Sequence, residues 1–512
     1  MKLINVEKER TLWEEKGYRV FTYDRNAMIE KARKNPSWVH FGSGNLFRAF
    51  QATFADELLE KGATDTGVIV VGGIASKDID EYYRAFHDLH ITVTLKADGS
   101  VDKRVVGSVA ESLKIEDNAR LKEIFEAPSL QVASFTITEK GYQVKDDNED
   151  LNRSPEEAET YFGKIVSLLY HRYTNGAYPL TLSSHDNCSR NGDVLKRGVY
   201  RFAEAWKDEG FISYLNEKVS FPIAMIDKIT PRPDQTVAAI LKEDGVEDLD
   251  DLDPTYYMNC FVNSEETQYL VIEDRFVNGR PSWEKAGIIF TDRDTVDKVE
   301  KMKVGTCLNP VHTALAIYGC LLGHTRIFEE MKDEELRKLA MHVGYDEGLP
   351  VVVDPGILDP KVFIDTVINV RLPNPFMPDT PQRIAMDTSQ KLPVRFGETL
   401  KSYKRQGKDL KELTYIPLVY AGWLRYLVGI DDDGNHFVLS SDPLLDTWES
   451  VFARYELGQT IPEEKISALL HDKAVFGVDL YEEGLDKKVL EYLNAMMEGR
   501  GAIRELLQDL EK

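Results

Sequence analysis

The sequence has no run of about 18 apolar residues, which is the length that a membrane-spanning helix needs. Its first residues also lack the apolar core of a secretory signal peptide. We therefore expect a cytoplasmic protein that does not contact a membrane.

Cysteine is scarce, and Cys188, Cys260, Cys307 and Cys320 are irregularly spaced. They form neither a disulfide framework nor paired CxxC motifs. His185 and Cys188 have the HxxC spacing of half a zinc site, but no second pair follows nearby. We expect no metal, and a zinc hydrolase built on these two residues is kept as an alternative.

Positive charge is also in short supply. The chain has 63 lysines and arginines against 87 aspartates and glutamates, so its net charge is −24. Nucleic acid would be repelled over most of such a surface, as would an anionic membrane, and we expect neither as a partner. An anionic small molecule can still bind where cations gather locally.

A glycine turn follows a short strand-like run at residues 38–41 and precedes a helical stretch at 51–61. This order suits a dinucleotide, because the glycines allow a tight turn and a close approach of the pyrophosphate to a helix N-terminus. Phe47 stands where a third glycine is expected, so a plain turn explains the pattern equally well. The expected cofactor-binding residues are Gly42, Ser43, Gly44, Asn45 and Leu46.

Two later strand ends add candidates for the cofactor site. Ser76 and Lys77 follow the apolar run 67–73, where an acidic residue would bind the ribose, so the choice between NAD and NADP stays open. The strand at 130–137 ends in Thr138, Glu139 and Lys140, and ligands bind beyond the carboxyl ends of such strands. Solvated turns are the alternative for these polar residues.

The chain of 512 residues is too long for one ordinary core, and 42% hydrophobic residues exclude global disorder. Strands and helices alternate in the first half, whereas helices dominate from about residue 295. The sequence therefore predicts an α/β protein. Residues 1–290 are expected to form a Rossmann-like dinucleotide-binding domain, and 291–512 a mostly α-helical substrate and catalytic domain.

The helical half contains a compact polar stretch at residues 303–312. Asn309 followed by Pro310 predicts a helix start with Asn309 as its N-cap, and the apolar run that follows predicts a buried helix. Such a helix would hold Asn309 and His312 rigidly toward a substrate, with Lys303 on the incoming segment. Each residue alone is more often structural or solvated.

Arg383 and Lys391 are separated by two helical turns, so on one helix they would lie about 80° apart and could bind a carboxylate together. Arg232 and Arg395 are further cations that could contribute positive charge to an anion-binding site. Surface salt bridges are the alternative.

From residue 38 to about 430 the chain resembles the polyol-specific long-chain dehydrogenases, or mannitol dehydrogenase family, which includes fructuronate and tagaturonate reductases. The resemblance rests on six stretches in the same order: residues 42–50, 134–142, 186–192, 221–231, 273–274 and 383–391. The sequence around 388–395 looks closer to the hexuronate reductases, particularly fructuronate reductases.

The family implies a Rossmann-like domain, a helical domain, a nicotinamide cofactor, no metal and a substrate between the domains. Its catalytic pattern is K-x4-N-x2-H. Asn309 and His312 match it, but Val304 occupies the lysine position and Lys303 comes one residue early. We retain Lys303 as the acid or base, since Gly305 and the start at Asn309 suggest that non-helical chain absorbs the shift.

The resemblance also implies roles for residues outside this pattern. Asn187 corresponds to a second oxyanion donor, and Arg383 and Lys391 to the substrate-binding pair. Asn191 and Asp227 are also expected to contact the substrate; Asp227 lies in an otherwise apolar strand, so a structural hydrogen-bonded role is its alternative. The predicted function is hydride transfer between NAD, or NADP, and a sugar acid of the fructuronate/mannonate or tagaturonate/altronate type. Alternatives are a mannitol or other polyol 2-dehydrogenase and a non-catalytic cofactor-binding regulator. A monomer or homodimer is expected.

Overall fold

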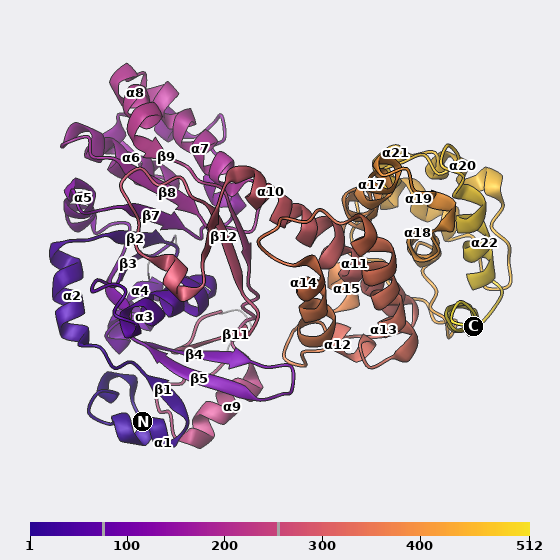
Figure 1. Cartoon of the computed structure of the whole chain (residues 1–512), viewed down its shortest axis with the longest axis horizontal. Coiled ribbons are helices and arrows are strands. Elements are labelled where there is room, and N and C mark those ends of the chain that lie inside the picture. Colours follow the sequence, from indigo (N-terminus) through magenta and orange to yellow (C-terminus); the bar gives the residue numbers. More distant parts are fainter. Residues whose placement is uncertain (74–76, 253–256) are drawn as a thin grey trace. The chain divides into compact units, whose positions relative to one another are not determined.

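The computed structural model describes residues 1–73, 77–252 and 257–512 and divides the chain into two compact units (Figure 1). The N-terminal unit comprises Met1–Lys96 and Ser100–Asp297. The C-terminal unit comprises Lys298–Lys512 and Ala97–Gly99. The division falls within helix α10 (Arg293–Met302).

The N-terminal unit is built on a six-stranded sheet in the order β6-β3-β2-β7-β8-β9, with every neighbouring pair parallel. This is the doubly wound order of a Rossmann fold, whose direction reverses between β2 and β7. The predicted α/β class is confirmed. The strands are β2 (Trp38–Phe41), β3 (Val68–Val71), β6 (Val109–Leu113), β7 (Val132–Phe135), β8 (Leu180–Ser184) and β9 (Val219–Ser220).

Helices cover both faces of this sheet, which explains why its strands are buried along almost their whole length. On one face, Val39 and Phe41 of β2 pack with α5 (Asn118–Glu126), α6 (Tyr161–Thr174) and α7 (Asn191–Trp206). On the other face, Trp38 and Val70 pack with α3 (Ala52–Glu60). The central strands are thereby held rigidly at the edge where the order reverses.

Two smaller sheets complete this unit. One has the order β1-β5-β4-β11, in which β4 and β5 form an antiparallel hairpin. The other has the order β10-β12-β13. Their strands are β1 (Tyr18–Val20), β4 (His90–Leu95), β5 (Val101–Val106), β10 (Ala224–Asp227), β11 (Phe261–Glu265), β12 (Tyr269–Glu273) and β13 (Ile289–Thr291).

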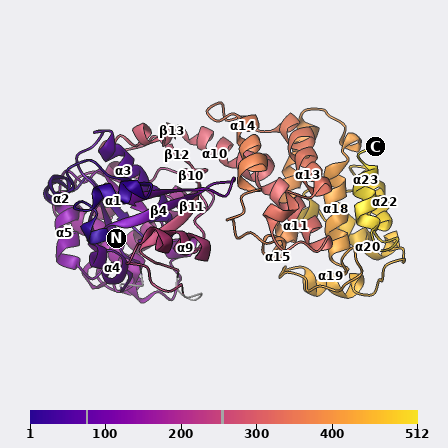
Figure 2. The ribbon, with the colours of Figure 1, turned by 90° about the horizontal axis from the view of Figure 1, so that it is seen from below.

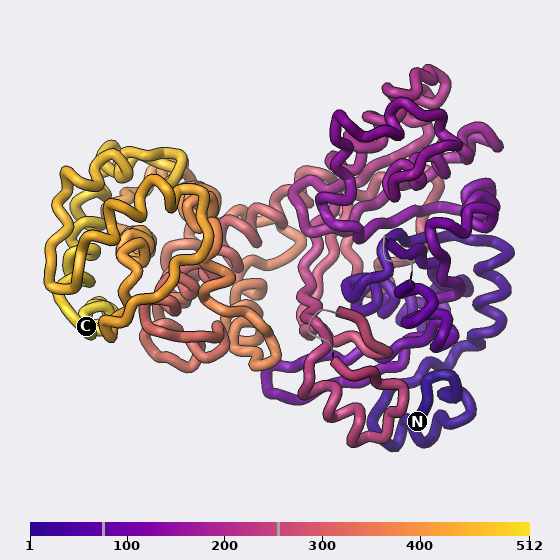
Figure 3. The backbone as a smooth tube through the Cα atoms, turned by 180° about the vertical axis from the view of Figure 1, so that it is seen from behind, coloured from indigo at the N-terminus to yellow at the C-terminus, as the bar shows by residue number. Residues whose placement is uncertain are grey.

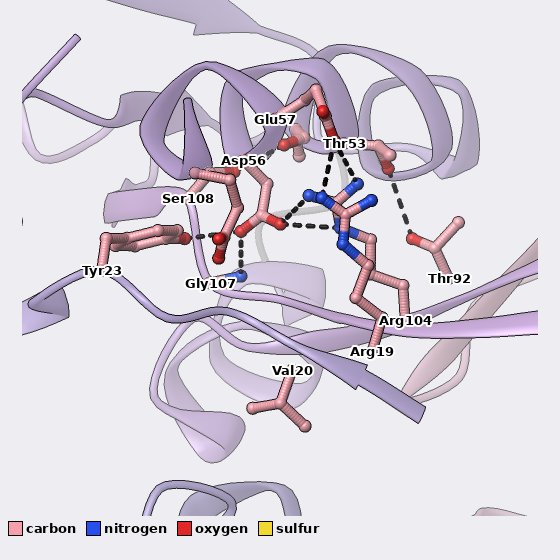
Figure 4. Close-up of polar contacts among 12 residues, drawn as sticks. Arg19, Val20, Tyr23, Thr53, Asp56, Glu57, Thr92, Arg104, Gly107 and Ser108 are labelled. Carbon is pink, nitrogen blue, oxygen red and sulfur yellow. Dashed lines mark hydrogen bonds and ion pairs between the residues drawn. The ribbon is translucent and has the colours of Figure 1, made fainter. Parts of the chain in front are cut away.

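A buried carboxylate fastens α3 to the hairpin (Figure 4). Asp56 accepts hydrogen bonds from Arg104 Nε at 2.7 Å, Gly107 N at 3.1 Å and Tyr23 OH at 2.5 Å. Burial raises the pKa of Asp56, and these partners oppose that shift because they favour the charged form. The network therefore makes a buried charge tolerable where α3 meets β5.

The C-terminal unit is helical (Figures 2 and 3). Its centre is α11 (Asn309–Leu321), which is buried along most of its length and packs against α13 (Glu334–Met341), α15 (Pro381–Ile384) and α18 (Tyr415–Tyr426). No helix within the described ranges is long and apolar enough to cross a membrane.

Shorter or peripheral helices complete both units. In the N-terminal unit they are α1 (Arg10–Glu15), α2 (Arg25–Lys34), α4 (Lys77–Tyr82), α8 (Glu209–Lys218) and α9 (Gln235–Asp244). In the C-terminal unit they are α12 (Ile327–Glu330), α14 (Pro360–Thr366), α16 (Thr388–Leu392), α17 (Glu398–Arg405), α19 (Leu445–Phe452), α20 (Glu463–Leu470), α21 (Lys473–Phe476), α22 (Asp486–Met496) and α23 (Ala502–Asp509).

Candidate functional site

The glycine turn lies directly after β2, at the edge where the strand order reverses. Gly42 has φ +114°, and a Cβ atom there would lie 2.3 Å from the carbonyl oxygen of Thr136. No other residue fits this position without moving the backbone. A Cβ atom on Gly44, in contrast, would meet no atom within 4 Å. The turn therefore leaves open space where a Rossmann fold binds a pyrophosphate.

The neighbouring residues of the turn are fixed by contacts to more distant segments. The Ser43 carbonyl accepts a hydrogen bond from Tyr83 OH at 2.6 Å, and Asn45 Nδ2 donates to the Tyr257 carbonyl at 2.8 Å. Asn45 Oδ1 is buried and has no hydrogen-bond partner among the described residues. An unsatisfied acceptor in this turn fits a ligand hydroxyl such as those of a dinucleotide. Leu46 is half-buried beside it.

The loop after β7 forms the other side of this edge. Thr138 has φ +66°, and its N–H donates to Asp186 Oδ1 at 2.9 Å. Asp186 Oδ2 accepts from Ile137 N at 3.0 Å and also from Tyr142 OH. The sequence marked Asp186 only as part of a motif, yet its carboxylate holds the whole loop in place.

Three other residues that we expected to bind the cofactor are Glu139, Lys140 and Ser76. Glu139 and Lys140 are exposed in the one-turn helix Glu139–Tyr142, and a role for them stays a prediction. Ser76 lies outside the described residues.

A buried histidine beneath the turn was not predicted. His40 hydrogen-bonds to Ser134 Oγ through Nδ1 at 2.7 Å and to Thr136 Oγ1 through Nε2 at 2.8 Å. Burial lowers the pKa of His40 well below its ordinary value, so the ring is neutral at pH 7. It fixes the side chain of Thr136, whose carbonyl oxygen lies against Gly42.

Polar residues after β8 have contrasting surroundings. Asn187 is exposed in the turn that follows the strand. Asn191 is fully buried: its Oδ1 accepts from Gly192 N and Ala224 N, both at 2.8 Å, and its Nδ2 donates to the Asp186 carbonyl at 2.9 Å. Asn191 therefore has a structural role, which differs from the substrate contact that we expected.

Two further residues of the N-terminal unit were candidates. Asp227 ends β10 with a buried side chain. His185 is buried, with Nε2 3.1 Å from Ser183 Oγ and Nδ1 3.4 Å from Gln51 Nε2. Across the part of the chain that the structure describes, no cluster of three or more His, Cys, Asp or Glu residues is arranged to hold a metal ion.

In the C-terminal unit, Lys303 begins a π-helical turn, Lys303–Cys307, that continues α10. The expectation of non-helical chain between Lys303 and Asn309 was wrong. A π-helical turn contains one residue more than an α-helical turn. The extra residue between Lys303 and Asn309, relative to the K-x4-N pattern, is therefore accommodated in the π-helical turn, and only Leu308, a bend, separates that turn from α11. Lys303 is 7% exposed.

The start of α11 also differs from the prediction. Leu308 is the N-cap, Asn309 is the first helical residue, and Pro310 is the second. Asn309 therefore is not the cap, because α11 begins one residue earlier than the dipeptide predicted. Its carboxamide makes no hydrogen bond to any of the described residues and is half-buried. The amide is thus available to a ligand.

His312, in the first turn of α11, has an unsatisfied ring. Its Nε2 is buried 3.4 Å from Asp379 Oδ2, yet it makes no hydrogen bond within the described parts of the chain. Burial lowers the pKa of His312 to about 4, although Asp379 opposes the shift. At neutral pH the ring is uncharged and can accept or donate one hydrogen bond to a substrate hydroxyl.

Arg383 and Lys391 do not share one helix, so the expected two-turn spacing was wrong. Arg383 belongs to α15 and Lys391 to α16, and Asp387 between them has φ +52°. Arg383 forms an ion pair with Asp379, whereas Lys391 Nζ donates to the Ile384 carbonyl at 2.9 Å. Both side chains nevertheless lie near one cluster of charges.

The cluster is electrostatically coupled to His312. Arg395, Arg383 and Arg371 each lower the pKa of His312. Burial lowers the pKa of Lys391 to about 8, and Arg395 and Arg383 add to that shift. Positive charge is thus concentrated beside the first turn of α11 in a chain whose net charge is −24. Such a cluster can bind an anionic substrate.

Known proteins match this arrangement over nearly the whole chain. The model of the mannitol dehydrogenase Rossmann domain matches residues 36–285, and that of the mannitol dehydrogenase C-terminal domain matches residues 295–497. D-mannonate oxidoreductase of Thermotoga maritima is 46% identical, covering 98% of this chain and 97% of its own. D-mannonate oxidoreductase of Escherichia coli is 30% identical, covering 87% and 91%.

A solved structure agrees with these sequence matches. Mannitol 2-dehydrogenase of Pseudomonas fluorescens, in a ternary complex with NAD and D-mannitol, is 26% identical with a TM-score of 0.69 and covers 97% of each chain. The glycine turn, the open space at Gly44 and the Rossmann strand order agree with a nicotinamide dinucleotide. The chain therefore belongs to the mannitol dehydrogenase family, and it is an oxidoreductase that acts on a CH–OH group with an NAD-type cofactor.

Proposed function

We propose that this protein interconverts a keto sugar acid and the corresponding hydroxy acid, of the fructuronate/mannonate type or the tagaturonate/altronate type. The observation that carries the proposal is the 46% identity over 98% of the chain to a D-mannonate oxidoreductase. The concentration of cations around His312 supports an acid rather than a neutral polyol.

The N-terminal unit would hold the dinucleotide through the turn Gly42–Leu46 and the loop that begins at Thr138. When bound, the nicotinamide supplies the hydride for reduction or accepts it in the reverse direction. NAD is the proposed cofactor, and NADP is the second choice. Residues 1–290 are assigned to cofactor binding and residues 291–512 to catalysis and substrate binding.

In the reductive direction, Lys303 would donate the proton that the carbonyl oxygen needs, and in the oxidative direction it would remove that proton. Carboxamide N–H groups of Asn309 and Asn187 would stabilise the negative charge that develops on the same oxygen. His312 would orient a substrate hydroxyl through its unsatisfied ring nitrogen. Lys391 would contribute positive charge near the carboxylate, and Asp227 would contact the sugar.

A direct test is an assay of the purified protein with NADH or NADPH against fructuronate, tagaturonate and fructose, each in turn. We expect NADH oxidation with one of the two uronates at a kcat/KM at least about tenfold above that with fructose. A preference for fructose would indicate a polyol dehydrogenase instead. Cofactor binding without turnover of any substrate would indicate a regulator. A cytoplasmic location and a monomeric or homodimeric state also belong to this proposal.

A further inference from the structure

Arg395 lies in the π-helical turn Pro393–Gly397 and reaches the first turn of α11. Its Nη1 donates to Thr313 Oγ1 and lies 3.5 Å from the Asn309 carbonyl oxygen. These contacts bring the guanidinium next to Asn309, the residue assigned to the reacting oxygen.

The rest of the guanidinium is unused. Nε and Nη2 of Arg395 make no hydrogen bond to the residues in 1–73, 77–252 and 257–512, and no carboxylate in those ranges lies within ion-pair distance. Neither nitrogen is among the completely buried atoms that lack a partner, so each keeps some solvent-accessible surface. Together they form one edge of the guanidinium, which is the edge that binds a carboxylate through two parallel hydrogen bonds.

Two fully buried arginines of this chain are engaged differently. Arg172 donates five hydrogen bonds to backbone carbonyls, and Arg425 donates three. A third, Arg48, donates only through Nη2, but its idle Nε and Nη1 are completely buried, unlike those of Arg395. Arg383, which is exposed, is paired with Asp379. Arg395 uses a single nitrogen for its contacts, so a purely structural role would leave most of its donors idle.

A partly buried cation without a carboxylate partner is costly, and an anionic ligand removes that cost. Burial lowers the pKa of Arg395 to about 10, which shows that its charged form is disfavoured in the absence of such a partner. Lys391 lies close enough for Arg395 to lower its pKa as well. Among the described residues Arg395 has no ion-pair partner, and Asp387 and Asp442 only partly oppose the shift of Lys391, so a substrate carboxylate would add a counter-ion.

We propose that Arg395 binds the substrate carboxylate through Nε and Nη2 and thereby selects a sugar acid over a neutral polyol. The inference rests on the proposed function and makes it more specific, because it assigns the acid group to Arg395 rather than to Arg383. Arg383 would instead hold the Asp379 carboxylate beside His312 through its ion pair with Asp379.

The test compares Arg395→Met, Arg395→Lys and the control Arg405→Met. Arg405 is exposed on α17, and its Nη2 donates to Ser402 Oγ at 2.7 Å. For each protein, calorimetry in the presence of saturating NADH, which cannot oxidise a hydroxy acid, measures the Kd of mannonate and of mannonamide, its neutral amide. If the wild-type assay shows that tagaturonate is the substrate, altronate and its amide are used.

We expect Arg395→Met to weaken binding of the acid about 100-fold and binding of the amide less than about threefold. Arg395→Lys should weaken binding of the acid about tenfold, because it keeps the charge and loses the two-pronged contact. Arg405→Met should change neither. Melting temperatures in the presence of NAD show whether a variant has a folding defect. If Arg395→Met is destabilised, the acid and amide affinities of Arg395→Lys decide whether Arg395 binds the carboxylate.

Equal losses for acid and amide would overturn the assignment and show that Arg395 only supports the fold. Unchanged binding of the acid would overturn it too. Both outcomes leave the proposed function standing if the wild-type protein reduces a uronate. A wild-type protein that reduces no uronate would overturn the proposed function and this inference together.

Discussion

At the scale of single residues, the clearest sign of a site is the set of polar groups left without partners. His312 Nε2 and Asn45 Oδ1 are buried without hydrogen bonds inside the described ranges. Buried polar groups in folded proteins are nearly always satisfied, so such exceptions indicate where a ligand supplies the missing partner. Sequence patterns selected both residues, but only coordinates could show that they are unsatisfied.

Lys303 offers the residue-scale test of the chemistry. Replacing Lys303 by Ala should reduce kcat about 10²-fold to 10⁴-fold, because no side chain would then give the substrate oxygen its proton or remove it. The Kd of NAD should stay within about threefold, since the proposed dinucleotide contacts lie in other residues. Steady-state kinetics and a cofactor titration measure the two quantities.

Lys301→Ala is the matched control, because Lys301 is an exposed lysine on the same helix. It should retain wild-type turnover. Turnover that is unchanged in the Lys303→Ala protein would remove Lys303 from the mechanism.

At the scale of elements, sequence reasoning located the strands and the glycine turn well, because hydrophobic periodicity, apolar runs and glycine are local signals of secondary structure. It failed where helix geometry depends on tertiary packing. The π-helical turn Lys303–Cys307 and the break at Asp387 leave no local signal that separates them from an α-helix or a loop. The Asn309 cap was predicted from a dipeptide, yet Asn309 is the first helical residue and Leu308 is the cap.

The glycine turn provides an element-scale prediction with a built-in control. Gly42→Ala should lower the free energy of unfolding by about 2 kcal/mol or more, because its φ is positive and the new Cβ would lie 2.3 Å from the Thr136 carbonyl oxygen. Gly44→Ala should change it by no more than about 0.5 kcal/mol, because that Cβ would enter open space.

Gly44→Ala, which should barely change stability, should change cofactor affinity. Gly44→Ala should weaken NAD binding about tenfold, since the methyl group would occupy space assigned to the pyrophosphate. Chemical denaturation and a fluorescence titration with NADH measure the two effects. A Gly44→Ala protein that binds NADH as tightly as wild type would place the pyrophosphate elsewhere.

At the scale of the whole molecule, the alternation of strands and helices followed by helices alone was enough to predict a Rossmann-like unit and a helical unit. The parallel order β6-β3-β2-β7-β8-β9 and the family matches agree with it. The sequence predicted the net charge of −24 and named Arg383, Lys391 and Arg395 as local cations. It did not predict that Arg371, Arg383 and Arg395 lie near His312, with Lys391 near Arg383 and Arg395, because this depends on the packing of separate helical turns.

The most direct test of the account follows the hydride itself. The purified protein is incubated with fructuronate, and separately with tagaturonate, and with NADH that carries deuterium at both hydrogens of nicotinamide C4. Mass spectrometry and NMR then examine the product. We predict a hydroxy acid with one deuterium on the carbon that carried the ketone, formed in equal amount to the NADH consumed. A product without deuterium, or no product from either uronate, would contradict the account.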